Sequence, residues 1–126
     1  MDLSSFATVF TQRRKTMFEQ TKESGYLYSS LATEPGFDEL VEMYVESIPD
    51  KINALLQSSA AREWDALATV AHQIKGSAES YGFAEITPYA ADLERASKED
   101  DSDEEAILNS MNELIEQCRR LRAGTP

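Results

Sequence analysis

The stretch that decides the fold is residues 64–82, WDALATVAHQIKGSAESYG. Its apolar side chains recur in steps of three and four, at Trp64, Leu67, Ala71, Ile74, Ala78 and Tyr81. This spacing lines up one face of an α-helix, and Gly82 can end the helix in a left-handed conformation. We expect Ser58 or Ser59 to cap its start. The stretch therefore predicts a long amphipathic helix that packs on a core.

Similar helical spacing recurs on both sides of this segment. It covers residues 37–56, where Pro49 is expected to kink or break the helix, and residues 86–93, where Pro88 sits near the start. It returns over residues 107–121, after an acidic run that we interpret as a solvated turn. Short connections between amphipathic helices favour antiparallel neighbours. The chain is therefore predicted to be all-α, with an antiparallel up-down-up-down four-helix bundle.

An additional helix is predicted at the N-terminus. Residues 1–25 form an amphipathic extension, and residues 26–126 form the bundle. Packing of the extension on the bundle is the favoured interpretation, and self-association or partner docking through Phe6, Phe10 and Phe18 is the alternative. Membrane association through the basic cluster at residues 13–15 is the weakest reading, because the whole chain is acidic.

Charge and cysteine content narrow the function classes. The 126 residues include 23 acidic and 12 basic side chains, for a formal net charge of −11. Such a surface repels nucleic acid and anionic lipid, so neither is an expected partner. One cysteine, Cys118, leaves no disulfide within a monomer. With no secretory signal pattern and no long apolar run, the expected location is the cytoplasm.

His72 is the only histidine, and it lies on the helix predicted over residues 64–82. At roughly 100° per residue it points about 130° away from the centre of the apolar stripe, so we expect it to reach solvent. Six residues share or flank its face: Asp65, Ala68, Thr69, Lys75, Gly76 and Glu79.

Two neighbours on the same helix face could affect the chemistry of this imidazole, one by its charge and one by its small size. The ammonium of Lys75 is one turn away and can offset the charge of a phosphoryl group on the ring. Gly76, four residues on, leaves room above His72, although a glycine inside a helix costs roughly 1 kcal/mol relative to alanine. A histidine has an unperturbed pKa of about 6.5, which makes a neutral, nucleophilic nitrogen available near neutral pH. Each feature alone is usually incidental, but the incidental readings of Lys75 and Gly76 do not explain why both lie at these offsets from His72.

These residues carry a specific resemblance. AHQIKGSA at residues 71–78, Gly82, and the Leu93-Glu94 pair resemble the signature of histidine-containing phosphotransfer (HPt) domains. The upstream Pro35-Gly36 and Ile48-Pro49 pairs also fit, and the resemblance covers roughly residues 27 to 122.

The resemblance implies a function and a set of site residues. His72 would be the phosphoacceptor, at Nε2, with Lys75 stabilising the phosphohistidine and Gly76 keeping access open. Asp65, Ala68, Thr69 and Glu79 are the candidate partner-binding residues. The partners would be response-regulator receiver domains and hybrid sensor histidine kinases in a multistep phosphorelay of a two-component system. The chain would be a monomeric phosphocarrier without cofactor or metal, and Mg²⁺ would sit on the receiver partner only.

Two other functions remain possible, and two more do not agree with the residues present in the sequence. A helical adaptor that binds receiver domains without taking phosphate is the main alternative. The phosphoacceptor domain of a chemotaxis-type kinase is a further possibility, although the short chain favours a free-standing carrier. A zinc site lacks ligands, with one histidine and one cysteine. Autokinase activity is not expected, because the chain has no glycine-rich phosphate loop.

Overall fold

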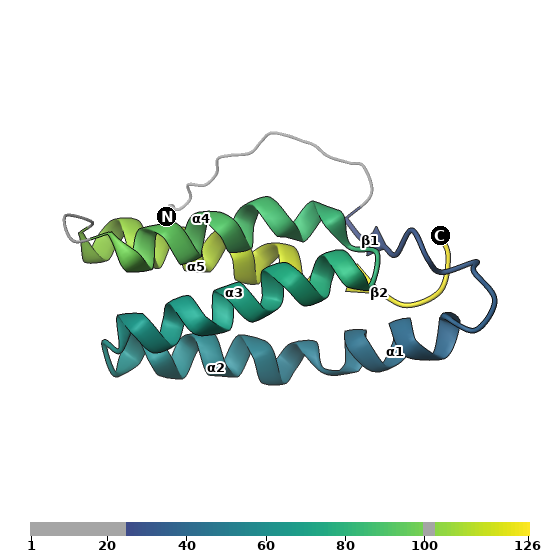
Figure 1. Cartoon of the computed structure of the whole chain (residues 1–126), viewed down its shortest axis with the longest axis horizontal. Coiled ribbons are helices and arrows are strands. Elements are labelled where there is room, and N and C mark those ends of the chain that lie inside the picture. Colours follow the sequence, from purple (N-terminus) through teal and green to yellow (C-terminus); the bar gives the residue numbers. More distant parts are fainter. Residues whose placement is uncertain (1–24, 100–102) are drawn as a thin grey trace, which may run out of the picture.

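The computed structural model describes residues 25–99 and 103–126. Within them the chain is mostly helical, which confirms the predicted helical bundle (Figure 1). The N-terminal helix predicted over residues 1–25 lies outside the described residues apart from its last position. The elements are β1 (Leu27–Tyr28), α1 (Asp38–Glu46), α2 (Ile48–Ala60), α3 (Trp64–Ser80), the 3₁₀ turn η1 (Ala84–Ile86), α4 (Thr87–Lys98), α5 (Glu104–Cys118) and β2 (Leu121–Arg122).

The interruption expected at Pro49 falls two residues earlier, at Ser47, between α1 and α2. Ser47 Oγ donates to the carbonyl oxygen of Tyr44 at 2.6 Å and accepts from Lys51 Nζ at 3.0 Å. Pro49 lies in the first turn of α2, where its missing N–H leaves no helical hydrogen bond unmade. The two helices therefore continue along nearly one line in Figure 1, with the break absorbed by a single residue.

The predicted cap of α3 is wrong, while its predicted end is confirmed. Ser58 and Ser59 belong to α2, and α3 begins at Trp64 with no side-chain cap. Gly82 follows α3 with φ +86°, a left-handed conformation that favours glycine. A Cβ on Gly82 would collide with Ser29 Oγ and lie 3.0 Å from two backbone nitrogens. Gly82 therefore serves both as a helix stop and as a close packing point.

The core lies between the helices and is made of the apolar faces that the spacing predicts. The largest fully buried side chains come from all the main helices and the η1 turn: Phe83, Leu55, Leu67, Ile74, Ile86, Leu93, Leu114, Val41 and Cys118. Figure 1 shows α2 and α3 joined at one end of the bundle and α3 and α4 at the other. Of the helix pairs, α3 and α4 pack most extensively against each other. This pairing fixes how the face of α3 that carries His72 meets α4.

A short parallel strand pair lies at one end of the bundle, and the spacing of apolar residues did not predict it. Leu27 of β1 pairs with Leu121 of β2, and the N–H of Leu27 donates to the carbonyl of Arg120 at 2.7 Å. Arg120 Nε also donates to the carbonyl of Gly25 at 2.7 Å. These contacts tie the start of the described chain to the end of α5.

Among the described residues, no helix is both long enough and apolar enough to pass through a lipid bilayer.

Candidate functional site

His72 lies in the middle of α3 with its side chain 65% exposed. The predicted solvent exposure is therefore confirmed. Its neighbour Ala71 is fully buried, so the helix places one residue in the core and the next at the surface. A rigid, well-packed helix thus carries an accessible imidazole.

The imidazole is held by a carboxylate from the neighbouring helix. His72 Nδ1 lies 3.0 Å from Oε2 of Glu94, on α4. The Glu94 side chain is only 12% exposed. The same carboxylate accepts from Lys75 Nζ, at 2.8 Å from Oε1, and from Lys98 Nζ, at 3.1 Å from Oε2. Glu94 is thus the common partner of three nitrogen atoms from α3 and α4.

These partners keep Glu94 ionised. Hydrogen bonds from Lys75 and then Lys98 lower the pKa of Glu94 to about 2, against the opposing effect of burial, and the bond from His72 adds to them. A buried carboxylate without such partners would be costly, because it would lose its hydration. The site therefore has a fixed negative charge behind the imidazole across the physiological pH range.

The Glu94 carboxylate determines which ring nitrogen of His72 carries the proton when the ring is neutral. A carboxylate accepts hydrogen bonds and donates none, so Nδ1 of the neutral ring carries the proton that Glu94 accepts. The lone pair is then on Nε2, the nitrogen that does not contact Glu94. The arrangement leaves Nε2 free on an exposed ring, beside a carboxylate that can stabilise positive charge developing on that ring.

Lys75 is close to His72, as predicted, but it contacts Glu94. Its side chain is 33% exposed, and its Nζ forms the 2.8 Å ion pair with Glu94 Oε1. The ammonium is therefore positioned one helical turn from the imidazole by a carboxylate that both residues share.

Gly76 faces open space. A Cβ built on it would meet nothing within 4 Å, and its helical backbone has no positive φ. A single methyl group at this position would therefore not touch the imidazole, and only a longer side chain could crowd the ring. The role of Gly76 in giving a partner access to the ring stays a prediction.

The four candidate partner-binding residues divide into two groups. Asp65, Thr69 and Glu79 are exposed on α3, and Thr69 Oγ1 donates to the Asp65 carbonyl at 3.1 Å. Ala68 is 3% exposed and belongs to the core. This corrects its placement on the open face: the apolar surface of α3 extends further around the helix than the stripe indicated. Ala68 is therefore not available to a partner.

Sequence reasoning gave no role to three residues that shape the site. Glu94 appeared only within the Leu93-Glu94 pair of the resemblance. Lys98 was assigned to the solvated turn after this helix, which is wrong, because α4 continues to Lys98 and places its ammonium on Glu94. Ser77 has a structural contact: its Oγ lies 2.9 Å from Tyr44 Oη, and the Tyr44 ring stacks on Tyr81 with centroids 4.6 Å apart. The contact joins α3 to α1 one turn from the site.

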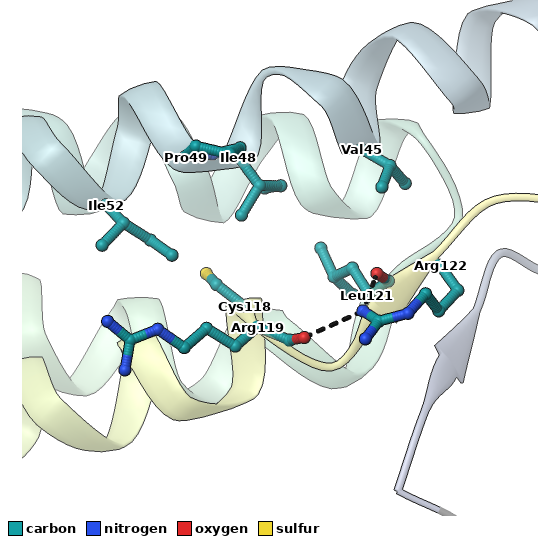
Figure 2. Close-up of a pocket in the computed structure, with 8 residues that line it drawn as sticks. All are labelled: Val45, Ile48, Pro49, Ile52, Cys118, Arg119, Leu121 and Arg122. Carbon is teal, nitrogen blue, oxygen red and sulfur yellow. Dashed lines mark hydrogen bonds between the residues drawn. The ribbon is translucent and has the colours of Figure 1, made fainter.

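A groove of about 390 Å³ lies elsewhere on the molecule, between the α1–α2 side and the end of α5 (Figure 2). Val45, Ile48 and Ile52 face Cys118 and Leu121 across it, and Arg119 and Arg122 stand at its edge. Burial raises the pKa of the Cys118 thiol to about 11. The groove is lined by neither His72 nor Glu94, so it is separate from the imidazole site.

Within residues 25–99 and 103–126, no three His, Cys, Asp or Glu side chains are grouped so as to hold a metal ion.

Residues 39–124 match the family model of the Hpt domain. The match spans α1 to β2 and includes His72, Lys75, Gly76 and Glu94. Searches of curated proteins and of solved structures returned no significant match.

Proposed function

The chain belongs to the Hpt domain family, and on that premise we propose that it carries a phosphoryl group on Nε2 of His72. Hpt domains are phosphocarriers of two-component phosphorelays. The observation that carries the proposal is the position of the imidazole: 65% exposed, with Nδ1 bound to a buried carboxylate and Nε2 left to react.

The proposed transfer begins with an aspartyl phosphate on a receiver domain. The lone pair on Nε2 attacks phosphorus, a P–N bond forms, and the P–O bond to the aspartate breaks. The aspartate leaves as a carboxylate, and the proton on Nδ1 stays in the hydrogen bond to Glu94. Positive charge develops on the ring as the P–N bond forms, and the Glu94 carboxylate stabilises it. The reverse sequence returns the phosphoryl group to an aspartate.

Lys75 would act on the product. Its ammonium, one turn from the imidazole, can turn toward the phosphoryl oxygens and form charge-assisted hydrogen bonds. The empty space over Gly76 would let the receiver's active site approach the ring. Asp65, Thr69 and Glu79, exposed on the same helix, would contact the receiver.

The proposed partners are receiver domains of response regulators and hybrid sensor histidine kinases. Mg²⁺ would be supplied by the receiver. We place the carrier in the cytoplasm as a monomer without autokinase activity. The alternating connections of α2, α3 and α4 support the antiparallel arrangement that we propose for the bundle.

The test is transfer from a phosphorylated receiver to the purified chain. We expect a label on the chain that is stable in alkali and labile in acid, as a phosphohistidine is. His72→Gln should abolish the label and leave the helical content unchanged, because the side chain is exposed. A label that remains on His72→Gln would contradict the proposal.

A matched control tests whether the histidine must be at position 72 or only present on α3. The double variant His72→Gln, Gln73→His moves the only imidazole one residue along α3, away from Glu94, at another exposed position. We expect this variant to remain unlabelled. The adaptor alternative predicts that the wild-type chain binds receivers but never takes up the label.

A further inference from the structure

Glu94 has more cationic partners than its single charge requires. The ammoniums of Lys75 and Lys98 both contact it, at 2.8 and 3.1 Å, and the Nδ1–H of His72 shares Oε2 with Lys98. With a neutral imidazole, two ammoniums and one carboxylate leave the cluster with a net charge of +1. In the unphosphorylated protein one ammonium is already enough to neutralise the charge of Glu94.

The surplus matters when a phosphoryl group arrives. A phosphoryl dianion on Nε2 attracts the ammonium of Lys75, which contributes most to keeping Glu94 ionised. As the ammonium of Lys75 turns to the phosphoryl oxygens, it gives Glu94 a smaller share of its charge and its hydrogen bonds. Glu94 is 12% exposed, so without another lysine its carboxylate would be left largely buried, with the Nδ1–H of His72 as its remaining partner.

We propose that Lys98 is a positioning residue that holds Glu94 in place and ionised while Lys75 turns to the phosphoryl group. This inference rests on the proposed phosphoacceptor role of His72. Transfer forms the P–N bond at Nε2, breaks the bond from phosphorus to its donor, and leaves the proton on Nδ1, so the cluster's charge changes from +1 to about 0. Without Lys98 the same cluster would reach about −1, with Glu94 and the phosphoryl group both dependent on Lys75.

A simpler role for Lys98 is the one its spacing suggests. Glu94 and Lys98 form an i,i+4 pair on α4, and such pairs stabilise helices whatever the state of a neighbouring site. That role predicts equal effects of a Lys98 substitution on the phosphorylated and unphosphorylated protein. The positioning role predicts a larger effect on the phosphorylated protein.

Arg95 provides a matched control on the same helix. Its guanidinium pairs with Asp92 at 2.7 Å, its side chain is 62% exposed against 61% for Lys98, and its ion pair does not involve Glu94. Arg95→Gln and Lys98→Gln therefore each remove one positive charge and one ion pair from α4. Only Lys98→Gln removes a partner of Glu94.

The experiment loads the full chain with phosphoramidate, so it needs no identified receiver. The P–N bond of the donor breaks, ammonia leaves, and the phosphoryl group bonds to Nε2 of His72. The loaded fraction is measured by ³¹P NMR at a fixed ratio of phosphoramidate to ammonia, at neutral pH and low salt. The midpoint of thermal unfolding is then measured for the loaded and unloaded forms of each variant.

We expect Lys98→Gln to lower the loading equilibrium about two- to fivefold, the range for an exposed charge. The loss should shrink at high salt because of screening. Arg95→Gln should load like the wild type, and Lys98→Arg should restore loading. Lys98→Gln should also lower the unfolding midpoint more in the loaded form than in the unloaded form.

Two results would overturn the inference. One is equal loading of Lys98→Gln and Arg95→Gln; the other is an equal loss of thermal stability by Lys98→Gln in the two forms. Failure of the proposed function looks different, because the wild-type chain itself would then take no label on His72.

Discussion

The phenol oxygen of Tyr44 lies 2.9 Å from the hydroxyl oxygen of Ser77, across the interface between α1 and α3. Ser77 directly follows Gly76, so this contact fixes the helix that carries His72 one turn beyond the imidazole. Burial raises the pKa of Tyr44, which keeps the phenol protonated and able to donate. The serine of the lysine-glycine-serine stretch therefore has a structural role close to His72.

Removing either hydroxyl should destabilise the bundle. We expect Tyr44→Phe and Ser77→Ala each to lower the free energy of unfolding by about 1 kcal/mol, as for a part-buried hydrogen bond. Urea unfolding of the two single variants and the double variant gives their coupling energy. The double variant should cost less than the sum of the single variants, and strict additivity would show that the hydroxyls do not interact.

Substitution of Glu94 should change the acid stability of the protein. The folded-state pKa of about 2 is below the ordinary 4.5, so the stabilisation is fully present above about pH 4.5 and is lost as the pH falls through 2. The wild type should therefore lose stability from this group over that range. Urea unfolding of the wild type and Glu94→Gln between pH 7 and pH 2 should give curves that converge in acid. Parallel curves would contradict the pairing.

Glu94→Gln should also slow phosphorylation of His72. The amide can accept from Nδ1–H, but it has no charge to stabilise the ring as the P–N bond forms. Loss of such a supporting partner reduces activity by roughly tenfold or more. The initial rate of labelling from a phosphorylated receiver measures this, with Arg95→Gln as a control for charge changes on α4. An unchanged rate would show that the carboxylate is not needed.

Two glycines should respond in opposite ways to alanine. Gly76→Ala meets no neighbour within 4 Å and should stabilise the bundle by about 0.5–1 kcal/mol, because alanine favours the helix. Gly82→Ala must adopt φ +86° and meet Ser29 and the backbone of Ser30 and Leu31, so it should destabilise by about 2 kcal/mol or more. Thermal unfolding of both variants checks the signs. Destabilisation by Gly76→Ala would show that the space over this residue is not free.

The thiol of Cys118 should be inert in the folded protein. It is 1% exposed, and burial raises its pKa to about 11, so little thiolate exists near pH 8. A disulfide reagent should label it only when urea unfolds the chain. Fast labelling in buffer alone would indicate that the groove beside α5 opens readily.

Much of this architecture follows from spacing along single helices. Residues 64–82 predicted the buried stripe of α3, the exposure of His72 and the left-handed Gly82, because each depends on local periodicity or on backbone conformation. The break at Ser47 was placed two residues late, because a proline is tolerated in the first turn of the helix that follows it.

The contacts between helices could not be predicted in the same way. The pairing of His72 with Glu94 and the burial of Ala68 depend on the rotation and axial position of α4 against α3, which the periodicity of either helix leaves undetermined. The β1–β2 pair was missed because two-residue strands are too short to show alternation.

That strand pair also affects the order in which the protein folds. The contact between Arg120 and Gly25 joins positions 95 residues apart, whereas the helices and their connections form from nearby residues. Closing so long a loop has a large entropic cost unless the helices have already brought its ends together. The β1–β2 pair should therefore form late in folding. Under mild denaturation it should open early, while α3 and α4, which carry His72 and Glu94, are still packed together.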